Sequence, residues 1–249
     1  MRTFGLDERD DAVACRPERL AVAGGDGSVG CAAEAAAQAG VPLAVITVGT
    51  ANDFARALDL PLDAENACRL AVEGTKTREL ELAWIEERPF VNVASAGLSP
   101  IAASKAHGLK HTIGALAYPI GALRAGLTAD PIGCRVTCDG SELFDGRAWQ
   151  VSVAATGAFG GGAGLAADPH DGKLDVVVIE AGSRARLVLH AYGLRAQKVE
   201  SQRGVHKARG RNVEVRTDGQ TGFNVDGERV DLDRARFRIR QGAFALVHG

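Results

Sequence analysis

The stretch RLAVAGGDGSVGCAAEAAAQAG, from Arg19 to Gly40, decides how we interpret the fold of this 249-residue chain. Its small and apolar residues at 20–23 predict a strand, and the alanine-rich run at 29–39 predicts a helix that ends at Gly40. Between them stands the loop Gly24-Gly25-Asp26-Gly27-Ser28. A strand, a glycine loop and a helix in this order are typical of an α/β domain, in which the loop backbone can approach a ligand closely.

The composition excludes several classes of protein. Hydrophobic residues make up 46% of the chain, an ordinary globular value, and the length suffices for two modest domains or one large one. A net charge of −2 argues against a general nucleic-acid binder. No apolar run approaches the roughly 20 residues of a membrane-spanning helix, and the N-terminus lacks an apolar signal core. Five scattered cysteines indicate reduced, structural thiols, so we expect a cytoplasmic protein.

The pattern along the chain changes near residue 78, where we place a domain boundary. Residues 1–78 alternate helix and strand signals, including a strand at 41–48, a short helix at 52–58 and a helix at 64–72 that Asp63 caps. Residues 79–249 are β-rich. In this division, the last residues of the chain could pack against the first domain again. The strand at 80–84 is expected to bury one face, and a hairpin turn should follow at 86–89. The further strands are expected at 90–93, 132–138, 148–155, 174–179, 212–217, 223–226 and 236–247, and further helices at 113–127 and 184–197.

The glycine loop is suited to binding phosphate. The helix after it offers unpaired N–H groups and a partial positive charge at its N-terminus. The spacing at 25–30 fits G-x-G-x-x-G, but this match alone is weak, and a P-loop lysine is missing. Asp26 would repel phosphates unless Mg²⁺ or water lay between them. The loop therefore favours metal-assisted phosphate chemistry, with a merely structural turn as the alternative.

A second polar segment, Gly49-Thr50-Ala51-Asn52-Asp53, follows the next predicted strand. Ligands of open α/β sheets bind at the carboxyl ends of the strands, so Asp26 and Asp53 should project into one cleft. Thr50 and Asn52 would add hydrogen-bonding groups to a Mg²⁺–nucleotide site. The alternative is that Asn52 and Asp53 only cap the short helix.

Together, the segments 24–28 and 49–55 resemble the diacylglycerol kinase catalytic domain, as found in soluble bacterial diacylglycerol and sphingosine kinase-like lipid kinases. NAD kinases and 6-phosphofructokinases share the first motif, whereas the second separates the lipid kinases from them. Five later segments are also similar to the family: Asn92–Gly97, Gly114–Tyr118, Gly160–Gly162, Pro169–Asp175 and Val225–Glu228.

The resemblance implies an ATP- and Mg²⁺-dependent lipid kinase that phosphorylates the hydroxyl of diacylglycerol or a related lipid at the membrane surface. Its α/β nucleotide domain would precede a β-sandwich, with ATP between them. The late D-G-E motif implies Glu228 as the catalytic base, with Asp226 as the second choice. A homodimer is compatible with the family.

The resemblance also assigns ligands. Asp26 and Asp53 would organise Mg²⁺ through water, and Glu81 stands where an aspartate usually joins them. Thr3 matches a nucleotide-binding threonine. A structural Mg²⁺ in the second domain would be bound by the Asp171 side chain and by the backbone carbonyls of Asp168 and Lys173. The alternative for Asp171-Gly172 is a hairpin turn between strands.

The chain also departs from the family pattern. Only about 19 residues precede the first strand, so the family's opening strand, N-P-x-S-G segment and helix are missing. An inactive nucleotide- or lipid-binding homologue is therefore the alternative function. Ser28 stands where the family usually has threonine, and Thr156 stands where it usually has asparagine. Residues 184–211 hold eight Lys or Arg and one acid, which fits either a solvated surface or peripheral contact with an anionic membrane.

Overall fold

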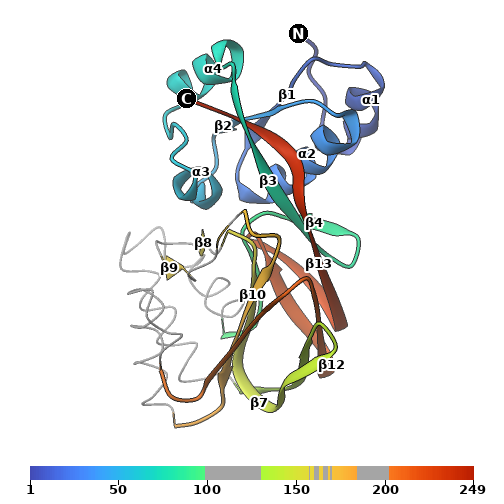
Figure 1. Cartoon of the computed structure of the whole chain (residues 1–249), viewed down its shortest axis with the longest axis vertical. Helices are drawn as coiled ribbons and strands as arrows, with labels where there is room; N and C mark the ends of the chain where they lie inside the picture. Colours follow the sequence, from blue (N-terminus) through green and yellow to red (C-terminus); the bar gives the residue numbers. More distant parts are fainter. Residues whose placement is uncertain (99–129, 157, 160–162, 165–167, 169, 184–201) are drawn as a thin grey trace.

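The structure is a computed structural model that describes residues 1–98, 130–156, 158–159, 163–164, 168, 170–183 and 202–249 (Figure 1). The helices expected at 113–127 and 184–197 and the glycine run at 160–162 lie outside the described residues. Figure 1 shows an α/β part that carries both chain ends and a β-rich part beside it. The expectation of an α/β domain followed by a β-sandwich is confirmed.

Local sequence signals explain most of the α/β part. Gly40 ends the long helix in the left-handed conformation (φ 67°), which glycine adopts without strain. Asp63 caps a later helix by accepting the backbone N–H of Asn66 at 2.9 Å. Among the described helices, none has the length and apolarity needed to cross a membrane. The elements are η1 (Leu6–Glu8), α1 (Arg9–Ala14), β1 (Leu20–Gly24), α2 (Asp26–Ala39), β2 (Leu43–Thr47), α3 (Asp53–Ala57) and α4 (Ala64–Glu73).

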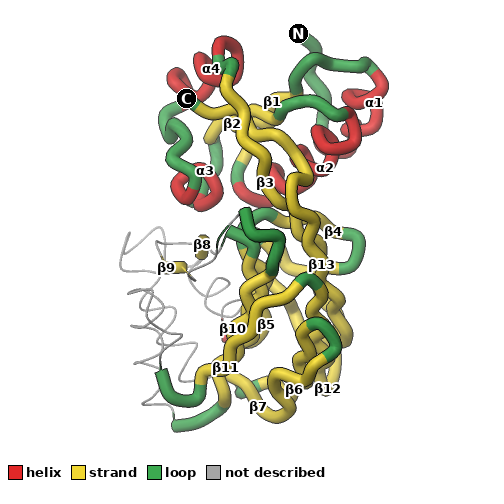
Figure 2. The backbone as a smooth tube through the Cα atoms, in the orientation of Figure 1, coloured by secondary structure: helices red, strands yellow, loops and turns green. Residues whose placement is uncertain are grey.

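In the β-rich part the described backbone is mostly strand (Figure 2). This part has its own core, made mainly of buried Val, Ala and Phe side chains. The two strands expected at 212–217 and 223–226 form one strand, because a register shift between Arg216 and Thr221 interrupts the ladder without ending it. Its strands are β3 (Lys76–Ile85), β4 (Arg88–Phe90), β5 (Val93–Gly97), β6 (Ile132–Cys138), β7 (Ser141–Ala154), β8 (Ala158–Phe159), β9 (Ala163–Gly164), β10 (Leu174–Glu180), β11 (Val205–Gly210), β12 (Asn212–Val225) and β13 (Glu228–His248).

The last strand, β13, joins the two parts. It pairs antiparallel with β12 and β3, and near its end Leu246 pairs in parallel with Leu43 of β2. The turn between β12 and β13 consists of Asp226 and Gly227, both at positive φ (46° and 94°). Two-residue hairpins need this left-handed backbone, which Asp and Gly tolerate.

The expectation that β3 is half-buried is wrong, because layers of the fold cover both of its faces. Leu80, Leu82 and Trp84 pack in the core around α2. Ala83 and Ile85 belong to the sandwich core instead, and Glu81 is also buried, at 4% exposure. The turn that follows is shorter than expected: Arg88 and Pro89 already belong to β4.

Candidate active site

The carboxylate of Asp26 joins the starts of two helices. Asp26 is the first residue of α2. Its Oδ1 accepts the backbone N–H of Phe54 at 2.8 Å, and its Oδ2 accepts that of Asp53 at 3.1 Å. These donors are the first two N–H groups of α3, which would otherwise lack an intrahelical partner. The structure thus brings Asp26 and Asp53 together.

The two glycine-containing loops touch backbone to backbone. A Cβ atom on Gly49 would lie 2.5 Å from the Cα of Gly25, closer than real Cβ atoms approach. Asn52 follows in the left-handed conformation (φ 51°), and its Nδ2 donates to the Gly49 carbonyl at 3.0 Å. Asn52 Oδ1 is buried without a hydrogen-bond partner. The absence of side chains at 25 and 49 therefore sets how closely the two loops approach.

The Asp26–Asp53 pair concentrates negative charge. Burial, together with the charge of Asp26, raises the pKa of Asp53 to about 6, while Arg56 acts in the opposite direction. Mg²⁺ prefers oxygen ligands and often binds through retained waters. The Asp53 carboxylate and the unpartnered Asn52 Oδ1 are therefore oxygens that could bind a cation through retained waters, with the negative charge of Asp26 beside them.

Asn92 connects this cluster to the β-rich part. Its buried amide donates from Nδ2 to Asp26 Oδ1 at 3.0 Å, and its Oδ1 accepts from Thr156 Oγ1 at 2.7 Å. The sequence does not single out either residue as part of the site. In the sequence, Asn92 is only the first residue of a segment similar to the family. Its bridging role could not be predicted, because it depends on how the two parts pack together.

Asp226 braces the segment between β4 and β5. Its carboxylate accepts the backbone N–H groups of Val91, Asn92 and Val93 at 2.7, 3.0 and 3.0 Å. Burial raises the pKa of Asp226 to about 7, although the three donors act to lower it. Both carboxylate oxygens are engaged, so Asp226 supports the site rather than offering a free oxygen to a substrate.

Glu228 has a different environment, although it lies only two positions after Asp226 in the sequence. Its side chain is 58% exposed and forms an ion pair with Arg88 at the start of β4. A Cβ atom on Gly27 would lie 2.7 Å from Glu228 Oε1. The late D-G-E turn therefore reaches the first turn of α2 and places an accessible carboxylate there.

Of the other predicted nucleotide-binding residues, Ser28 and Thr50 lie next to the glycine-containing loops, and Thr3 lies near the start of the chain. Ser28 is in the first turn of α2, and a Cβ atom on Gly24 would lie 2.7 Å from the Ser28 Cβ. Thr50 is exposed just beyond the end of β2. Thr3 is exposed near the start of the chain, and its side chain forms no hydrogen bond with another described residue. Ser28 and Thr50 thus border the site, whereas no hydrogen bond among the described residues links Thr3 to it.

Glu81 lies with the segment before β10 instead of with the Asp26–Asp53 pair. Its Oε2 accepts the backbone N–H of Gly172 at 2.8 Å, while its Oε1 is buried without a partner. Burial, together with the charges of Asp171, Asp168 and Asp175, raises the pKa of Glu81 to about 7, although the Gly172 N–H acts to lower it. The carboxylate expected near the nucleotide metal is therefore part of a second acidic cluster.

The predicted structural metal ligands have protein partners. Asp171 Oδ1 accepts the N–H of Lys173 at 2.9 Å, and Asp171 Oδ2 is paired with Arg209. Asp168 Oδ1 accepts the N–H of His170 at 3.0 Å. Within the described ranges, no group of three or more His, Cys, Asp or Glu residues is arranged to hold a metal ion. Both oxygens of the Asp171 side chain, the carboxylate expected to bind the cation, are therefore engaged by groups of the protein.

Among the described strands, none forms a hairpin with β10 through Asp171-Gly172, which was the alternative predicted for these residues. The strand that follows, β10, pairs with β7 and β11. The segment before it therefore does not join two paired strands.

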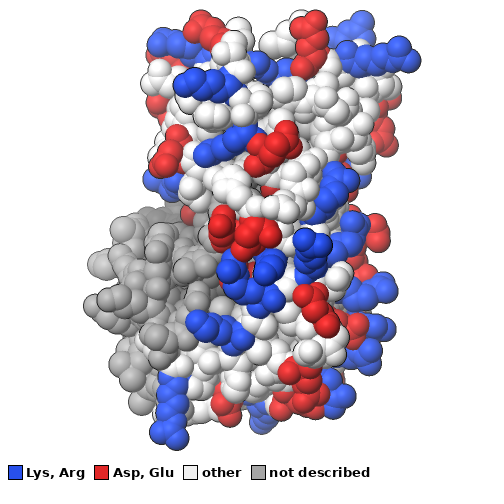
Figure 3. Space-filling model, viewed as in Figure 1, with Lys and Arg blue, Asp and Glu red and all other residues white. Residues whose placement is uncertain are grey.

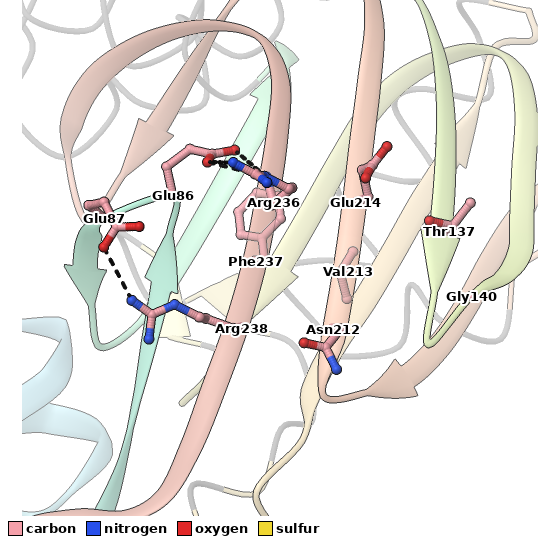
Figure 4. Close-up of a pocket in the computed structure, with 10 residues that line it drawn as sticks. All are labelled: Glu86, Glu87, Thr137, Gly140, Asn212, Val213, Glu214, Arg236, Phe237 and Arg238. Atoms are coloured by element: carbon pink, nitrogen blue, oxygen red, sulfur yellow. Dashed lines mark hydrogen bonds and ion pairs between the residues drawn. The ribbon is translucent and has the colours of Figure 1, made fainter.

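A separate hollow of about 460 Å³ lies on the sandwich (Figure 4). Its rim carries the ion pairs Glu86–Arg236 (2.9 Å) and Glu87–Arg238 (3.5 Å). None of the predicted site residues lines it. Charges of both signs are also interspersed on the face shown in Figure 3, so this view shows no surface dominated by one sign of charge.

The contacts of Asp26, Asn92 and Glu228 assign the candidate active site to the junction of α2, α3 and the β12–β13 turn.

Comparisons with known proteins find a family match for each of the two parts of the chain. Residues 6–84 match the diacylglycerol kinase catalytic domain, and residues 92–248 match the YegS C-terminal NAD kinase beta sandwich-like domain. The chain is 32% identical to a Pseudomonas fluorescens protein named "probable lipid kinase YegS-like" over 95% of this chain and 79% of that protein. It is 29% identical to the Bacillus subtilis diacylglycerol kinase over 86% of this chain and 75% of that enzyme.

Solved structures share the fold. A diacylglycerol kinase from Bacillus anthracis superposes with a TM-score of 0.77 at 20% identity, covering all of this chain and 84% of the other. An NAD kinase from Archaeoglobus fulgidus, solved with ATP, gives a TM-score of 0.51 at 14% identity over 99% of this chain and 90% of the other.

Proposed function

Since the chain belongs to the diacylglycerol kinase-like lipid kinases, which are phosphotransferases, we propose that it transfers the γ-phosphoryl group of ATP to a lipid hydroxyl in a Mg²⁺-dependent reaction. Diacylglycerol or a related lipid alcohol at a membrane surface is the proposed acceptor. The observation that carries this proposal is the position of Glu228 beside Gly27, at the N-terminus of α2.

The ATP phosphates would lie against the first turn of α2. The helix has 14 residues, and its N-cap, Gly25, has no side chain to cover the first N–H groups. Such a terminus favours anions through these donors and the helix dipole. Ser28 and Thr50 would supply hydroxyl groups at the border of the site.

Asp53 would hold the accompanying Mg²⁺ through water, and Asp26 would add its negative charge next to it. When bound, the cation neutralises charge that develops on the phosphates. The chain's own contribution is to fix the two carboxylates: Asp26 is held by the N–H groups of α3 and by Asn92. Asn92 would thereby fix the position of Asp26 relative to the β-rich part.

Glu228 would accept the proton of the lipid hydroxyl. As this proton leaves, the lipid oxygen forms a bond to the γ-phosphorus and the bond from that phosphorus to the bridging oxygen of ADP breaks. Arg88, which pairs with Glu228, would orient the carboxylate. Asp226 would support Glu228 by anchoring the turn that carries it.

We further propose that the α/β domain comprises residues 1–78 together with the end of β13. Support comes from the pairing of Leu246 with Leu43 in β2. The ATP site would then lie between this domain and the sandwich, since Asp26 comes from one and Glu228 from the other.

Transfer of labelled γ-phosphate tests the proposal. The protein is incubated with ATP and micelles of diacylglycerol, monoacylglycerol, sphingosine, ceramide or phosphatidylglycerol, with and without Mg²⁺. A Mg²⁺-dependent product from one lipid supports the kinase and identifies its substrate class. No product from a folded protein would favour the inactive nucleotide- or lipid-binding homologue.

The base is tested with Glu228→Gln. The variant should lose turnover by about 10²-fold or more, as expected for a missing general base, and keep its affinity for ATP. Glu87→Gln is the matched control because Glu87 is 94% exposed and lies on the rim of the separate hollow. Full turnover by Glu228→Gln would show that another group accepts the proton.

A further inference from the structure

We propose that Arg209 takes the place of a divalent cation at the segment His170–Asp175, so that this segment keeps its conformation without bound metal. The family resemblance implies a structural Mg²⁺ at Asp171 in the second domain. The structure instead shows a guanidinium group bound to that carboxylate.

The register of the sheet brings Arg209 to this position. Strands β10 and β11 are antiparallel, and Asp175 lies directly opposite Arg209. Opposed residues project from the same face of a sheet. Arg209 Nε lies 3.0 Å from Asp175 Oδ1, and its Nη2 contacts Asp171 Oδ2. One planar guanidinium therefore links the carboxylates on both sides of Gly172, as its forked donors allow.

The same contacts oppose a metal ion at Asp171. Its Oδ1 accepts the N–H of Lys173, and its Oδ2 is paired with Arg209. A cation at Oδ2 would have to displace the guanidinium against the repulsion of its positive charge. Mg²⁺ also requires near-octahedral geometry and gives up its waters reluctantly. The guanidinium is therefore the better match for the oxygens that this segment presents.

Two further contacts fix the segment from neighbouring strands. Gly172, at φ 69°, donates its N–H to Glu81 Oε2 of β3. Gln241 of β13 donates from Nε2 to the His170 carbonyl at 2.5 Å. With Arg209 of β11, three strands therefore hold the segment through groups of the protein itself. Glu81 Oε1 is buried without a hydrogen-bond partner, so a metal bound beside Glu81 is the alternative to be tested.

Thermal unfolding of the full chain provides the test, with neither nucleotide nor lipid present. Because phosphoryl transfer needs ATP and lipid, this measurement does not depend on whether the protein is an active kinase. The midpoint should change by less than about 1 °C between EDTA and millimolar MgCl₂ or CaCl₂. A fall of several degrees in EDTA, or one equivalent of metal retained after dialysis, would overturn the proposal.

The same thermal unfolding measurement on Arg209→Met provides a second test. The substitution removes the guanidinium and frees Asp171 Oδ2, so the midpoint in EDTA should fall by roughly 2 °C or more and rise again with Mg²⁺. Arg211→Met is the matched control, because Arg211 is exposed and has no ion pair among the described residues. An Arg209→Met protein whose midpoint does not respond to Mg²⁺ would contradict the proposal. If this variant fails to fold, the wild-type comparison decides alone.

Discussion

Glu228 Oε1 lies so close to Gly27 that a Cβ atom at Gly27 would be only 2.7 Å from this oxygen. Gly27 belongs to the first turn of α2, and Glu228 begins β13 at the other end of the chain. The helix that would receive the phosphates therefore meets the proposed base directly. A side chain at position 27 has to displace this carboxylate.

Gly27→Ala should lower the rate of phosphoryl transfer without lowering stability. Misplacing a catalytic group by about 1 Å can cost on the order of 10²-fold in rate, whereas alanine is a better helix former than glycine by about 1 kcal/mol. Steady-state kinetics and thermal unfolding of the same variant check the two effects. Gly219→Ala is the control, since a Cβ atom there meets nothing within 4 Å. Unchanged turnover in Gly27→Ala would mean that Glu228 can be displaced harmlessly.

Gly49→Ala should weaken both folding and ATP binding. The new Cβ would lie 2.5 Å from the Cα of Gly25, and backbone atoms cannot move aside as a flexible side chain can. Overpacking of this kind costs about 1–3 kcal/mol. Urea unfolding and nucleotide binding by equilibrium dialysis measure the effects. Wild-type values for both would show that the two loops do not need their close approach.

Asn92→Asp should destabilise the protein by about 1–3 kcal/mol at neutral pH. The substitution replaces the donor to Asp26 by a carboxylate oxygen and places two like charges together. Thr156→Val removes only the hydrogen bond to Asn92 Oδ1 and should have a smaller effect, about 1 kcal/mol. Urea unfolding of the two variants tests this order. Equal effects would assign no special role to the contact between Asn92 and Asp26.

The stability should fall as the pH rises from about 4 to 7. The pKa values of Asp53, Glu81 and Asp226 are raised to about 6, 7 and 7, whereas those of the unfolded chain lie near 4. Within this window the folded state holds more protons, so deprotonation favours unfolding. Above about pH 7 this contribution levels off. Glu86 and Glu214 act oppositely, because arginine partners lower their pKa, and their contribution is lost only in stronger acid.

Thermal midpoints without nucleotide or metal should therefore be several degrees higher at pH 5.5 than at pH 8. Asp226→Asn removes one of the titrating groups, so the variant should show a smaller difference between these two pH values, whatever its absolute stability. A midpoint that increases from pH 5.5 to 8 would contradict the assignment of these groups.

Local patterns account for the parts of the fold that were predicted correctly. Gly40 and Asp63 end and begin helices through contacts within a few residues, so their neighbours in the sequence suffice. The burial of Glu81 could not be predicted in this way. The alternation at 80–84 shows one apolar face, but the layer that covers the other face comes from distant strands.

The sequence by itself determined the kind of chemistry: a glycine loop with Asp26, a second loop with Asn52 and Asp53, and a late acidic turn. Only the tertiary structure separated the roles of Asp226 and Glu228, because the three N–H groups that bind Asp226 are held in place by strands from elsewhere in the chain. The register of β10 and β11 likewise brought Arg209 to Asp171. Hydrogen bonds and ion pairs between distant segments form only when the backbone is fixed, so residue type and spacing do not encode them locally.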